Sequence, residues 1–402
     1  MKIERPRGTH DILPSEQPLW RKVTAEMERL CALYGYRPIQ TPVFEDVALF
    51  QRSAGEGSDV VQKEMYVFED RGGRTLALRP EATAPICRAY VENGMQREPQ
   101  PVKLYTLATY YRYDKPQRGR YREHNQLSVE CIGSAAPAVD AEVIELYDTF
   151  LRNVGITRYE LHLNSIGDRA CRPAYLDRLN AWLDEHDGLL DADARQKRAT
   201  SPLRVFDVKS PQVRAALEDA PKIGESLCPA CEEHFAAVRE ALDAAGVRYV
   251  LDPTLVRGLD YYSRTTWEFL GPGQSLSGGG RYDYLIEQIG GPPTPGVGFG
   301  AGIERILLSL ELEGIAAAED MLDVFVAAEP GQPVRTLLAR LRATGISADA
   351  DYAGRSMKGQ IGYGQKRARS TLVVTDGGMT LRRHGELDVE VDEATLLELL
   401  GR

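Results

Sequence analysis

Two apolar runs joined by a long basic loop constrain the fold of this chain most strongly. Residues 104–111 and 126–132 have the apolar, β-branched and aromatic composition that is typical of strands. Proline and glycine punctuate the loop between them, so the two runs predict a hairpin. The cationic side chains of the loop are Lys115, Arg118, Arg120 and Arg122. Guanidinium groups match phosphate oxygens two at a time, so such a loop suits a polyanion.

The second strand of this hairpin carries polar side chains at alternate positions. Gln126, Ser128 and Glu130 therefore share one face of the strand, and Arg112 lies at the end of the first strand. The pattern predicts an amide and a carboxylate beside a phosphate clamp. From the basic run alone, a solvated hairpin tip is the alternative interpretation.

The composition is typical of a globular protein with more than one domain. The 402 residues predict two or three domains, with an ordinary 43% of hydrophobic and 27% of charged residues. A net charge of −10 disfavours bulk electrostatic binding of nucleic acid but leaves a local basic track open. The sequence has neither an apolar run of membrane-spanning length nor a charged-then-apolar start. We therefore expect a cytoplasmic protein without a membrane partner.

The six cysteines are scattered, and only Cys228 and Cys231 form a close pair, with His234 nearby. Structural zinc takes four ligands, usually from two such pairs, and the sequence has no second pair. A redox role would need a thioredoxin-like βαβ pattern, which does not surround this pair. We therefore assign no metal ligand among the protein side chains.

Helical and strand-like patterns alternate in the N-terminal part. Apolar spacing predicts a helix over residues 15–33, and a strand-like run at 37–44 contains Pro42. Residues 65–68 and 75–78 predict a second hairpin.

A helix opens after this hairpin, within the sequence Arg-Pro-Glu-Ala-Thr. Pro80 suits its first turn, and Glu81 and Thr83 lie near its positive end. From spacing alone, Glu81 is a capping carboxylate.

The composition and the predicted secondary structure change in the middle of the chain. A predicted helix (140–154) and strand (158–163) precede a charged, alanine-rich helical stretch over residues 169–244, and a strand returns at 247–251. Residues 296–301 fit G-x-G-x-x-A, but the Gly/Pro-rich segment 290–295 cannot supply the strand that a dinucleotide-binding motif requires. The sequence has no Walker A pattern, so a P-loop does not hold a nucleotide.

The C-terminal part predicts a separate α/β domain. Strands at 323–327 and 371–375 alternate with helices at 334–341 and 356–369. Its local basic patch is a binding surface or a solvated helix face, and comprises Arg355, Lys358, Lys366, Arg367 and Arg369.

Several motifs, in one order along nearly the whole chain, resemble the histidyl-tRNA synthetases, a class II aminoacyl-tRNA synthetase family. They are GTHDILP at 8–14, RPEAT at 79–83, the hairpin at 109–133, RGLDYY at 257–262, and GGGRYD through GVGFGAGIERI at 278–306. The resemblance implies an α+β catalytic core, an antiparallel sheet flanked by helices, in two parts at 1–168 and 245–318. It also implies a helical insertion at 169–244 and a C-terminal α/β anticodon-binding-like domain at 322–402.

The resemblance also implies roles for individual residues. The catalytic residues are Arg112, Arg257 and Arg305, which neutralise charge on ATP. The histidine-binding residues are Glu81, Ala82, Thr83, Arg112, Gln126, Glu130, Arg257, Tyr261, Tyr262 and Tyr282. The ATP-binding residues are Arg112, Asp114, His124 and Arg305, and those at the tRNA acceptor end are Lys115, Gln117, Arg118 and Arg120.

The implied reaction activates L-histidine with ATP and Mg²⁺ and acylates tRNA(His), in a homodimer formed through the region of Pro42. Asp114 and His124 depart from the Glu and Phe usual at the adenine-reading positions, and Tyr284 stands where Gly is common. One alternative is a synthetase-like regulatory subunit of ATP phosphoribosyltransferase, and another is a synthetase-like RNA-binding protein without catalysis. The presence of Arg112, Arg257 and Arg305 favours the enzyme.

Overall fold

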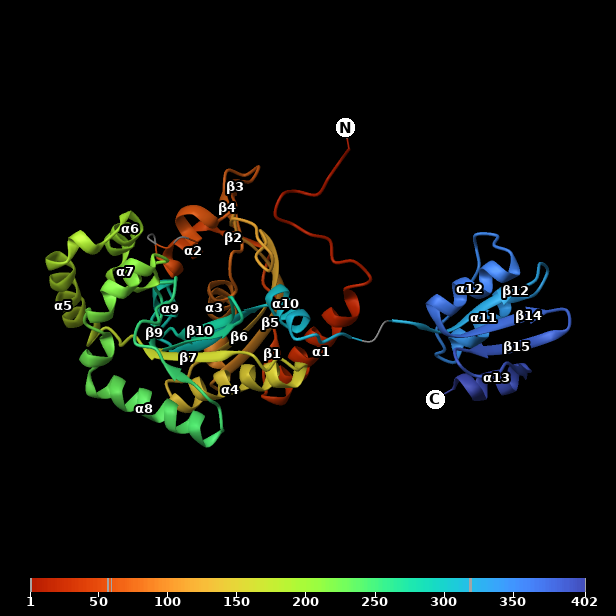
Figure 1. Cartoon of the computed structure of the whole chain (residues 1–402). Coiled ribbons are helices and arrows are strands. Elements are labelled where there is room, and N and C mark those ends of the chain that lie inside the picture. Colours follow the sequence, from red (N-terminus) through yellow and green to blue (C-terminus); the bar gives the residue numbers. More distant parts are fainter. Residues whose placement is uncertain (1, 56–57, 59, 318–319, 402) are drawn as a thin grey trace. The chain divides into compact units, whose positions relative to one another are not determined.

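The structure, a computed structural model, describes residues 2–55, 58, 60–317 and 320–401. The chain divides into two compact units between residues 317 and 318 (Figure 1). The core was predicted to end at residue 318, and Ala318 and Glu319 lie outside the described residues. No described helix combines the length and the apolar character needed to cross a lipid bilayer.

A mixed eight-stranded sheet forms the centre of the first unit, in the order β1-β5-β6-β11-β10-β9-β7-β8. Its strands are β1 (Arg37–Pro38), β5 (Val102–Tyr111), β6 (Glu123–Ile132), β7 (Glu160–Ser165), β8 (Val250–Leu251), β9 (Ser263–Gly271), β10 (Gln274–Arg281) and β11 (Gly296–Gly302). Neighbours from β5 across to β7 pair antiparallel, whereas the outermost pairs β1–β5 and β7–β8 are parallel. The predicted antiparallel core is confirmed, with a parallel pair added at each edge.

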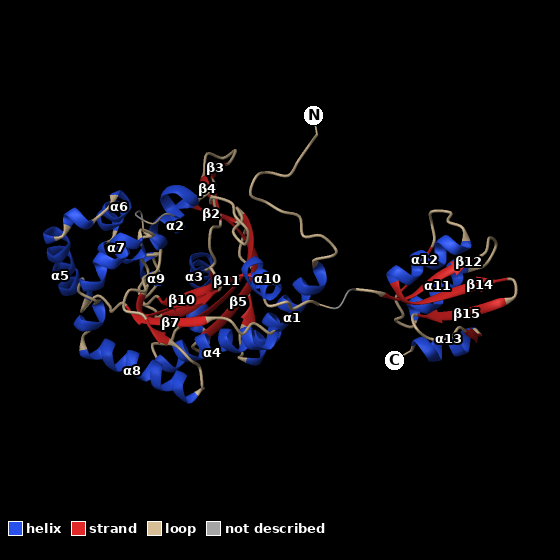
Figure 2. Cartoon of the chain, viewed as in Figure 1, coloured by secondary structure: helices blue, strands red, loops and turns tan. Residues whose placement is uncertain are grey.

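Helices flank both faces of this sheet (Figure 2). They are α1 (Gln17–Leu33), α2 (Val47–Ala54), α3 (Thr83–Glu92), α4 (Pro137–Val154), α9 (Leu285–Gln288) and α10 (Ile303–Leu312). Leu127 and Val129 of β6 point into the main core, which α1, α4 and α10 share. A second cluster, which includes residues of α3 and α9, covers part of the other face. Gln126, Ser128 and Glu130 alternate with the core residues of β6, as the sequence predicted, so they face away from the main core.

The strand-like run predicted over residues 37–44, which contains Pro42, is divided between two sheets. The segment contributes β1 to the large sheet, and its last residue begins β2 (Phe44–Asp46) in a separate sheet, of order β2-β4-β3. Proline lacks the N–H that a continuous ladder would need, and Pro42 lies between the two pieces. The hairpin predicted next is present as β3 (Val67–Glu69) and β4 (Thr75–Leu78).

The helix predicted to contain Pro80 begins later than expected. It starts at Thr83, so Pro80 precedes the helix and does not occupy its first turn. The carboxylate of Glu81 accepts the backbone N–H of Thr83 at 2.6 Å and that of Ala84 at 2.9 Å. These two bonds satisfy N–H groups of the first helical turn, so the helix begins after Pro80.

The stretch predicted to be a helical insertion is helical in the structure. Its helices are α5 (Arg172–Glu185), α6 (Ala192–Thr200), α7 (Pro211–Ala216) and α8 (Pro229–Ala244), with 3₁₀ turns between them. A local hydrophobic cluster joins the residues from Tyr175 to Ile223. Val238 and Leu242 of α8 belong instead to the main core, and α8 packs on α4. The segment with its own core is therefore shorter than residues 169–244.

The second unit is a small α/β domain around a five-stranded sheet of order β13-β12-β14-β15-β16. Its elements are β12 (Leu322–Ala328), α11 (Val334–Ala343), β13 (Ala348–Ala350), α12 (Met357–Arg367), β14 (Ala368–Thr375), β15 (Gly378–Arg383), β16 (Val389–Val391) and α13 (Glu393–Leu400). The strand β12 is parallel to both of its neighbours, and the remaining pairs are antiparallel. The predicted α/β fold of this part is confirmed.

Candidate active site

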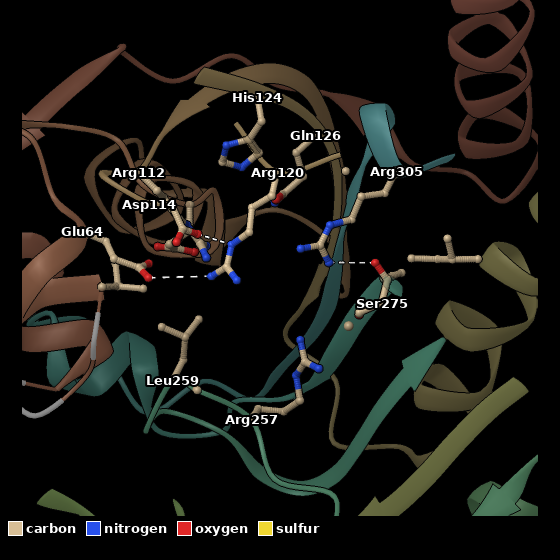
Figure 3. A pocket seen from close by; sticks show the side chains of 18 of the residues that line it. Glu64, Arg112, Asp114, Arg120, His124, Gln126, Arg257, Leu259, Ser275 and Arg305 are labelled. Carbon is tan, nitrogen blue, oxygen red and sulfur yellow. Dashed lines mark hydrogen bonds and ion pairs between the residues drawn. The ribbon is translucent and has the colours of Figure 1, made fainter. Parts of the chain in front are cut away.

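A cavity of about 310 Å³ gathers side chains from distant parts of the first unit (Figure 3). It lies beside the even-numbered residues of β6, the face that points away from the main core. Residues predicted as functional that line it are Glu81, Thr83, Arg112, Asp114, Arg120, His124, Gln126, Arg257, Tyr261, Tyr262 and Arg305. Ala82, Glu130 and Tyr282 are buried behind the wall, and Lys115, Gln117 and Arg118 lie outside it.

The three arginines predicted as catalytic line the same cavity. The Nε of Arg112 donates to the carbonyl of Pro80 at 2.8 Å, and Nη1 of Arg305 donates to the carbonyl of Ser275 at 2.8 Å. No described carboxylate is in ion-pair contact with either group. Their positive charges are therefore held in place by neutral acceptors and remain available to an anion.

Arg257 reaches the cavity from the loop before β9. Its Nη1 lies 2.9 Å from Oε1 of Glu268 on that strand. A Cβ added to Gly278 would lie 1.9 Å from Nη2 of Arg257, so a residue with a side chain at 278 would displace the guanidinium group. The glycine cluster of β10, a weak signal in the sequence, thus makes room for a charged side chain.

Arg120 differs from the other residues predicted at the tRNA acceptor end, because its side chain points into the cavity (Figure 3). It forms an ion pair with Asp114 and lies 3.9 Å from the carboxylate of Glu64. A tight turn with Gly119 at φ +74° sets this direction. Arg118, by contrast, is exposed and pairs with Glu311 at 2.6 Å. The structure therefore divides the basic loop into a cavity-facing and a solvent-facing part.

Burial and the positive charges in the cavity lower the pKa of Arg305 and of His124. Burial lowers the pKa of Arg305, and the neighbouring Arg120 and Arg112 lower it further. Burial and the same arginines lower the pKa of His124 to about 3. The imidazole of His124 is thus neutral at physiological pH, which suits stacking on a base. The cavity wall carries five arginines and five carboxylates, but Arg112, Arg120 and Arg305 lie close enough to act on one another's charge, and such a cluster of guanidinium groups suits a polyanionic ligand.

Glu81 is a buried carboxylate among the residues that line the cavity. Glu81, which caps α3, also lines the cavity wall, so the capping and ligand-binding interpretations apply to one side chain. Burial raises its pKa, although its two backbone N–H bonds oppose that effect. An ammonium group is the ligand that would stabilise the charged form.

Glu130 supports the wall from behind. Oε1 accepts a hydrogen bond from Oγ1 of Thr83 at 2.7 Å, and Oε2 accepts one from the hydroxyl of Tyr282 at 2.6 Å. Its side chain is 0% exposed, and burial raises its pKa to about 8. A Cβ on Gly298 would lie 1.9 Å from Oε2, and one on Gly300 would lie 2.5 Å from Nε2 of Gln126. The G-x-G-x-x-A pattern, part of strand β11, therefore serves side-chain packing.

The N-terminal motif holds the basic loop from outside. The backbone N–H of Arg122 donates to the carbonyl of Gly8 at 2.7 Å. The ring of His10 stacks on that of Tyr121, with centroids 4.3 Å apart. Residues 8–14 were identified from the sequence by resemblance alone, and these contacts give them a physical role in orienting the loop.

Four charged residues of the cavity wall were missed in the sequence. They are Glu64, Arg204, Asp207 and Glu304. Glu304 accepts the backbone N–H of Asn125 at 2.8 Å and its amide at 3.0 Å, which ties α10 to β6. The position of Glu304 next to Arg305, a residue predicted to bind ATP, could have indicated that Glu304 also lines the site. Arg204 and Asp207 come from the insertion, and no local pattern indicates that this segment reaches the cavity.

Fold and cavity together define a class of protein. An antiparallel sheet flanked by helices, with arginines from separate motifs converging on one cavity beside a buried carboxylate, is the architecture of a class II aminoacyl-tRNA synthetase. The sequence model described as histidyl-tRNA synthetase matches residues 8–306. This chain belongs to the histidyl-tRNA synthetase family.

Individual relatives agree with the family assignment. A histidine–tRNA ligase of Desulforudis audaxviator is 46% identical over 419 residues, covering 100% of this chain and 99% of the relative. A histidine–tRNA ligase of Dehalococcoides mccartyi is 47% identical over 366 residues, covering 89% of this chain and 88% of the relative. The crystal structure of apo S. aureus histidyl-tRNA synthetase matches with a TM-score of 0.84 at 35% identity, covering 100% of both chains. The resemblance read from the motifs is confirmed.

Proposed function

We propose that this chain activates L-histidine with ATP and transfers it to the 3′ end of tRNA(His). The carboxylate of histidine attacks the α-phosphate of ATP and releases pyrophosphate, and the resulting adenylate acylates the terminal ribose of the tRNA. Four arginines that converge on one cavity carry this proposal, namely Arg112, Arg120, Arg257 and Arg305. Because this reaction needs positioning and charge neutralisation, no protein nucleophile is required.

In this proposal each arginine binds a different part of the nucleotide. Arg112 and Arg257 flank the α-phosphate and the histidine carboxylate, while Arg305 and Arg120 hold the distal phosphates. The neutral ring of His124 stacks on adenine. Asp114 pairs with Arg120 and therefore orients that arginine rather than contacting adenine directly.

The proposed histidine site is the part of the cavity that Glu81 lines. Glu81 accepts the α-ammonium, with Thr83 beside it. Gln126 and Tyr262, which line the cavity, form hydrogen bonds with the imidazole of the substrate. Glu130 acts as a positioning residue, because its oxygens hold Thr83 and Tyr282. A pocket that hydrogen-bonds both ring nitrogens rejects apolar amino acids.

Magnesium accompanies the ATP polyphosphate in this proposal. The carboxylates of Glu64 and Glu304 at the cavity wall are hard oxygen donors of the type that Mg²⁺ takes. The ion supplies neutralisation of the polyphosphate charge when it is bound.

Two surfaces suit the tRNA. The exposed Lys115, Gln117 and Arg118 at the loop tip would meet the acceptor end. In the second unit, Arg355 lies over the ring of Tyr363 at 4.2 Å and Arg367 at 5.7 Å. Cations interleaved with an aromatic ring favour contact with unpaired bases, which supports the anticodon-binding proposal. We also propose that the enzyme works in the cytoplasm.

The decisive experiment is pyrophosphate exchange into ATP by the purified full chain. We expect exchange only when L-histidine is present, followed by charging of tRNA(His). Exchange that does not depend on histidine would refute the specificity. Histidine binding without any exchange would instead indicate the regulatory-subunit alternative, which no feature of the cavity favours.

We also propose a homodimer formed through the small sheet near Pro42. Val43, just before β2, and Phe44, its first residue, are 44% and 51% exposed, and Val67 and Phe68 of β3 are 49% and 41% exposed. The rings of Phe44 and Phe68 lie 6.2 Å apart, so these two side chains form an exposed apolar patch, whereas Val43 and Val67 alternate with them along the chain and face the other side of the small sheet. Such a patch marks an interaction surface.

Sedimentation tests this interface. The wild-type chain should sediment as a dimer, and Phe44→Asp should shift it to the monomer, because a charge in an apolar interface loses its solvation. Leu189→Asp is the matched control, since Leu189 is 49% exposed in the insertion, away from the patch. A dimer that persists in Phe44→Asp would place the interface elsewhere.

A further inference from the structure

A cluster of three thiols and one carboxylate lies where the helical insertion joins the catalytic core. Asp168 and Cys171 follow strand β7 and lead into α5, whereas Cys228 and Cys231 lie at the start of α8. The segment between the two pairs contains the separate insertion core. The cluster therefore brings together the entry and the exit of the insertion, at its neck.

The four ligand atoms have the spacing of a tetrahedral metal site. All of them lie within 4.8 Å of one another. The Sγ atoms of Cys171 and Cys231 are 3.9 Å apart, and Oδ1 of Asp168 lies 3.7 Å from the first and 4.0 Å from Sγ of Cys228. Tetrahedral zinc with its usual bond lengths places two sulfurs about 3.8 Å apart and a sulfur about 3.5 Å from a carboxylate oxygen. The sulfur–sulfur separation of 3.9 Å agrees with that geometry, and the two sulfur–oxygen separations of 3.7 and 4.0 Å are slightly longer than it requires.

The surroundings favour metal binding over ordinary packing. Asp168, Cys171 and Cys231 are buried, with 6%, 5% and 0% exposure, so solvent does not satisfy their polar atoms. Nε and Nη2 of Arg264 donate to Oδ2 of Asp168 at 3.3 and 3.2 Å, and the backbone N–H of Ala170 donates to Oδ1 at 2.9 Å, which holds Oδ1 beside the sulfurs of Cys171 and Cys228. A carboxylate fixed in this way is typical of a supported metal ligand. The sulfur separation of 3.9 Å is far beyond the ~2.05 Å of a disulfide bond.

We propose that Asp168, Cys171, Cys228 and Cys231 bind one structural Zn²⁺ ion. Binding releases the protons of the three thiols to solvent, so the carboxylate, three thiolates and the cation carry a net charge of −2. The guanidinium group of Arg264 offsets part of that charge. The sequence argument counted only Cys-x-x-Cys pairs, whereas in this proposal the second pair is Asp168 with Cys171, three residues apart.

The bound ion fastens the insertion to the catalytic core. The four ligands do not line the active-site cavity, so the role is structural. Arg172 lies directly after the neck and donates to the carbonyls of Ile166, at 3.2 Å, and Tyr262, at 2.8 Å. Because Tyr262 lines the cavity, Arg172 connects the neck of the insertion to the proposed histidine site through hydrogen bonds.

Metal analysis of the full chain, purified under reducing conditions without chelator, tests the proposal. We expect about one zinc per chain, and cobalt substituted for it should show thiolate charge-transfer bands and the visible d–d bands of a tetrahedral site. Cys228→Ser should lose most of the zinc and the charge-transfer intensity. Cys31→Ala, which removes a buried cysteine of the main core, should retain both.

Stability gives a second readout that does not depend on activity. Chelation should lower the melting temperature of the wild type and of Cys31→Ala, and should leave that of Cys228→Ser unchanged. A wild-type chain without bound metal that also gives no cobalt–thiolate bands would overturn the proposal. So would a Cys171–Cys231 disulfide found in freshly purified protein.

Discussion

Replacing Arg257 with alanine should lower the rate of histidine-dependent pyrophosphate exchange by about 10²–10³-fold, the loss expected for one preorganised charge donor at a reacting centre. The side chain lies in the cavity, with Nη1 on Glu268 and with Gly278 leaving space for its other nitrogen. Charge builds on the α-phosphate in the transition state, so the loss should appear in kcat rather than in the KM for ATP alone.

Two controls separate chemistry from structure. Arg248→Ala removes an exposed arginine that precedes β8 and does not line the cavity, and it should leave exchange unchanged. The double variant Arg257→Ala with Glu268→Gln removes the acid that the single change leaves without its partner, and it should be as slow as the single variant. Recovery of exchange in the double variant would mean that the stranded carboxylate, rather than the lost guanidinium, caused the defect. A near-wild-type rate in Arg257→Ala would remove this residue from the mechanism.

Local patterns predicted most of the elements that carry the site. The strands β5 and β6 and the alternation of Gln126 and Glu130 followed from composition and period, because one face of β6 must enter the core. The resemblance to the histidyl-tRNA synthetases assigned Arg112, Arg257 and Arg305 to one site, and the structure brings them to one cavity. Separate motifs can indicate one site because each motif contributes some of the residues that line it.

The sequence could not reveal contacts that depend on tertiary structure. Whether Arg120 points to solvent or into the cavity depends on a turn at Gly119 and on Asp114, and its neighbours in the loop have the same composition. The buried ion pair of Arg281 with Asp140 joins β10 to α4, and no local pattern links residues that far apart. Long-range pairing of charges is set by the fold, so it must be read from the structure.

Glu130→Gln should change the pH dependence of stability in the ligand-free protein. Burial raises the pKa of Glu130 from the ordinary 4.5 to about 8, so the folded state holds a proton that the unfolded chain releases. The free energy of unfolding should therefore fall as pH rises from about 4.5 to 8, by up to about 1.4 kcal/mol per pH unit. Below that window the group is protonated in both states and the effect vanishes.

The glutamine side chain is uncharged throughout this window and has nearly the same shape. It can accept a hydrogen bond from one of Thr83 and Tyr282 and donate one to the other, because a hydroxyl group can turn. Relative to wild type, Glu130→Gln should gain up to about 4 kcal/mol between pH 5 and pH 8. Urea unfolding followed by tryptophan fluorescence at both pH values measures the difference, with the exposed Glu240→Gln as the control. Parallel pH profiles for wild type and Glu130→Gln would show that the buried carboxyl is not protonated in the folded state.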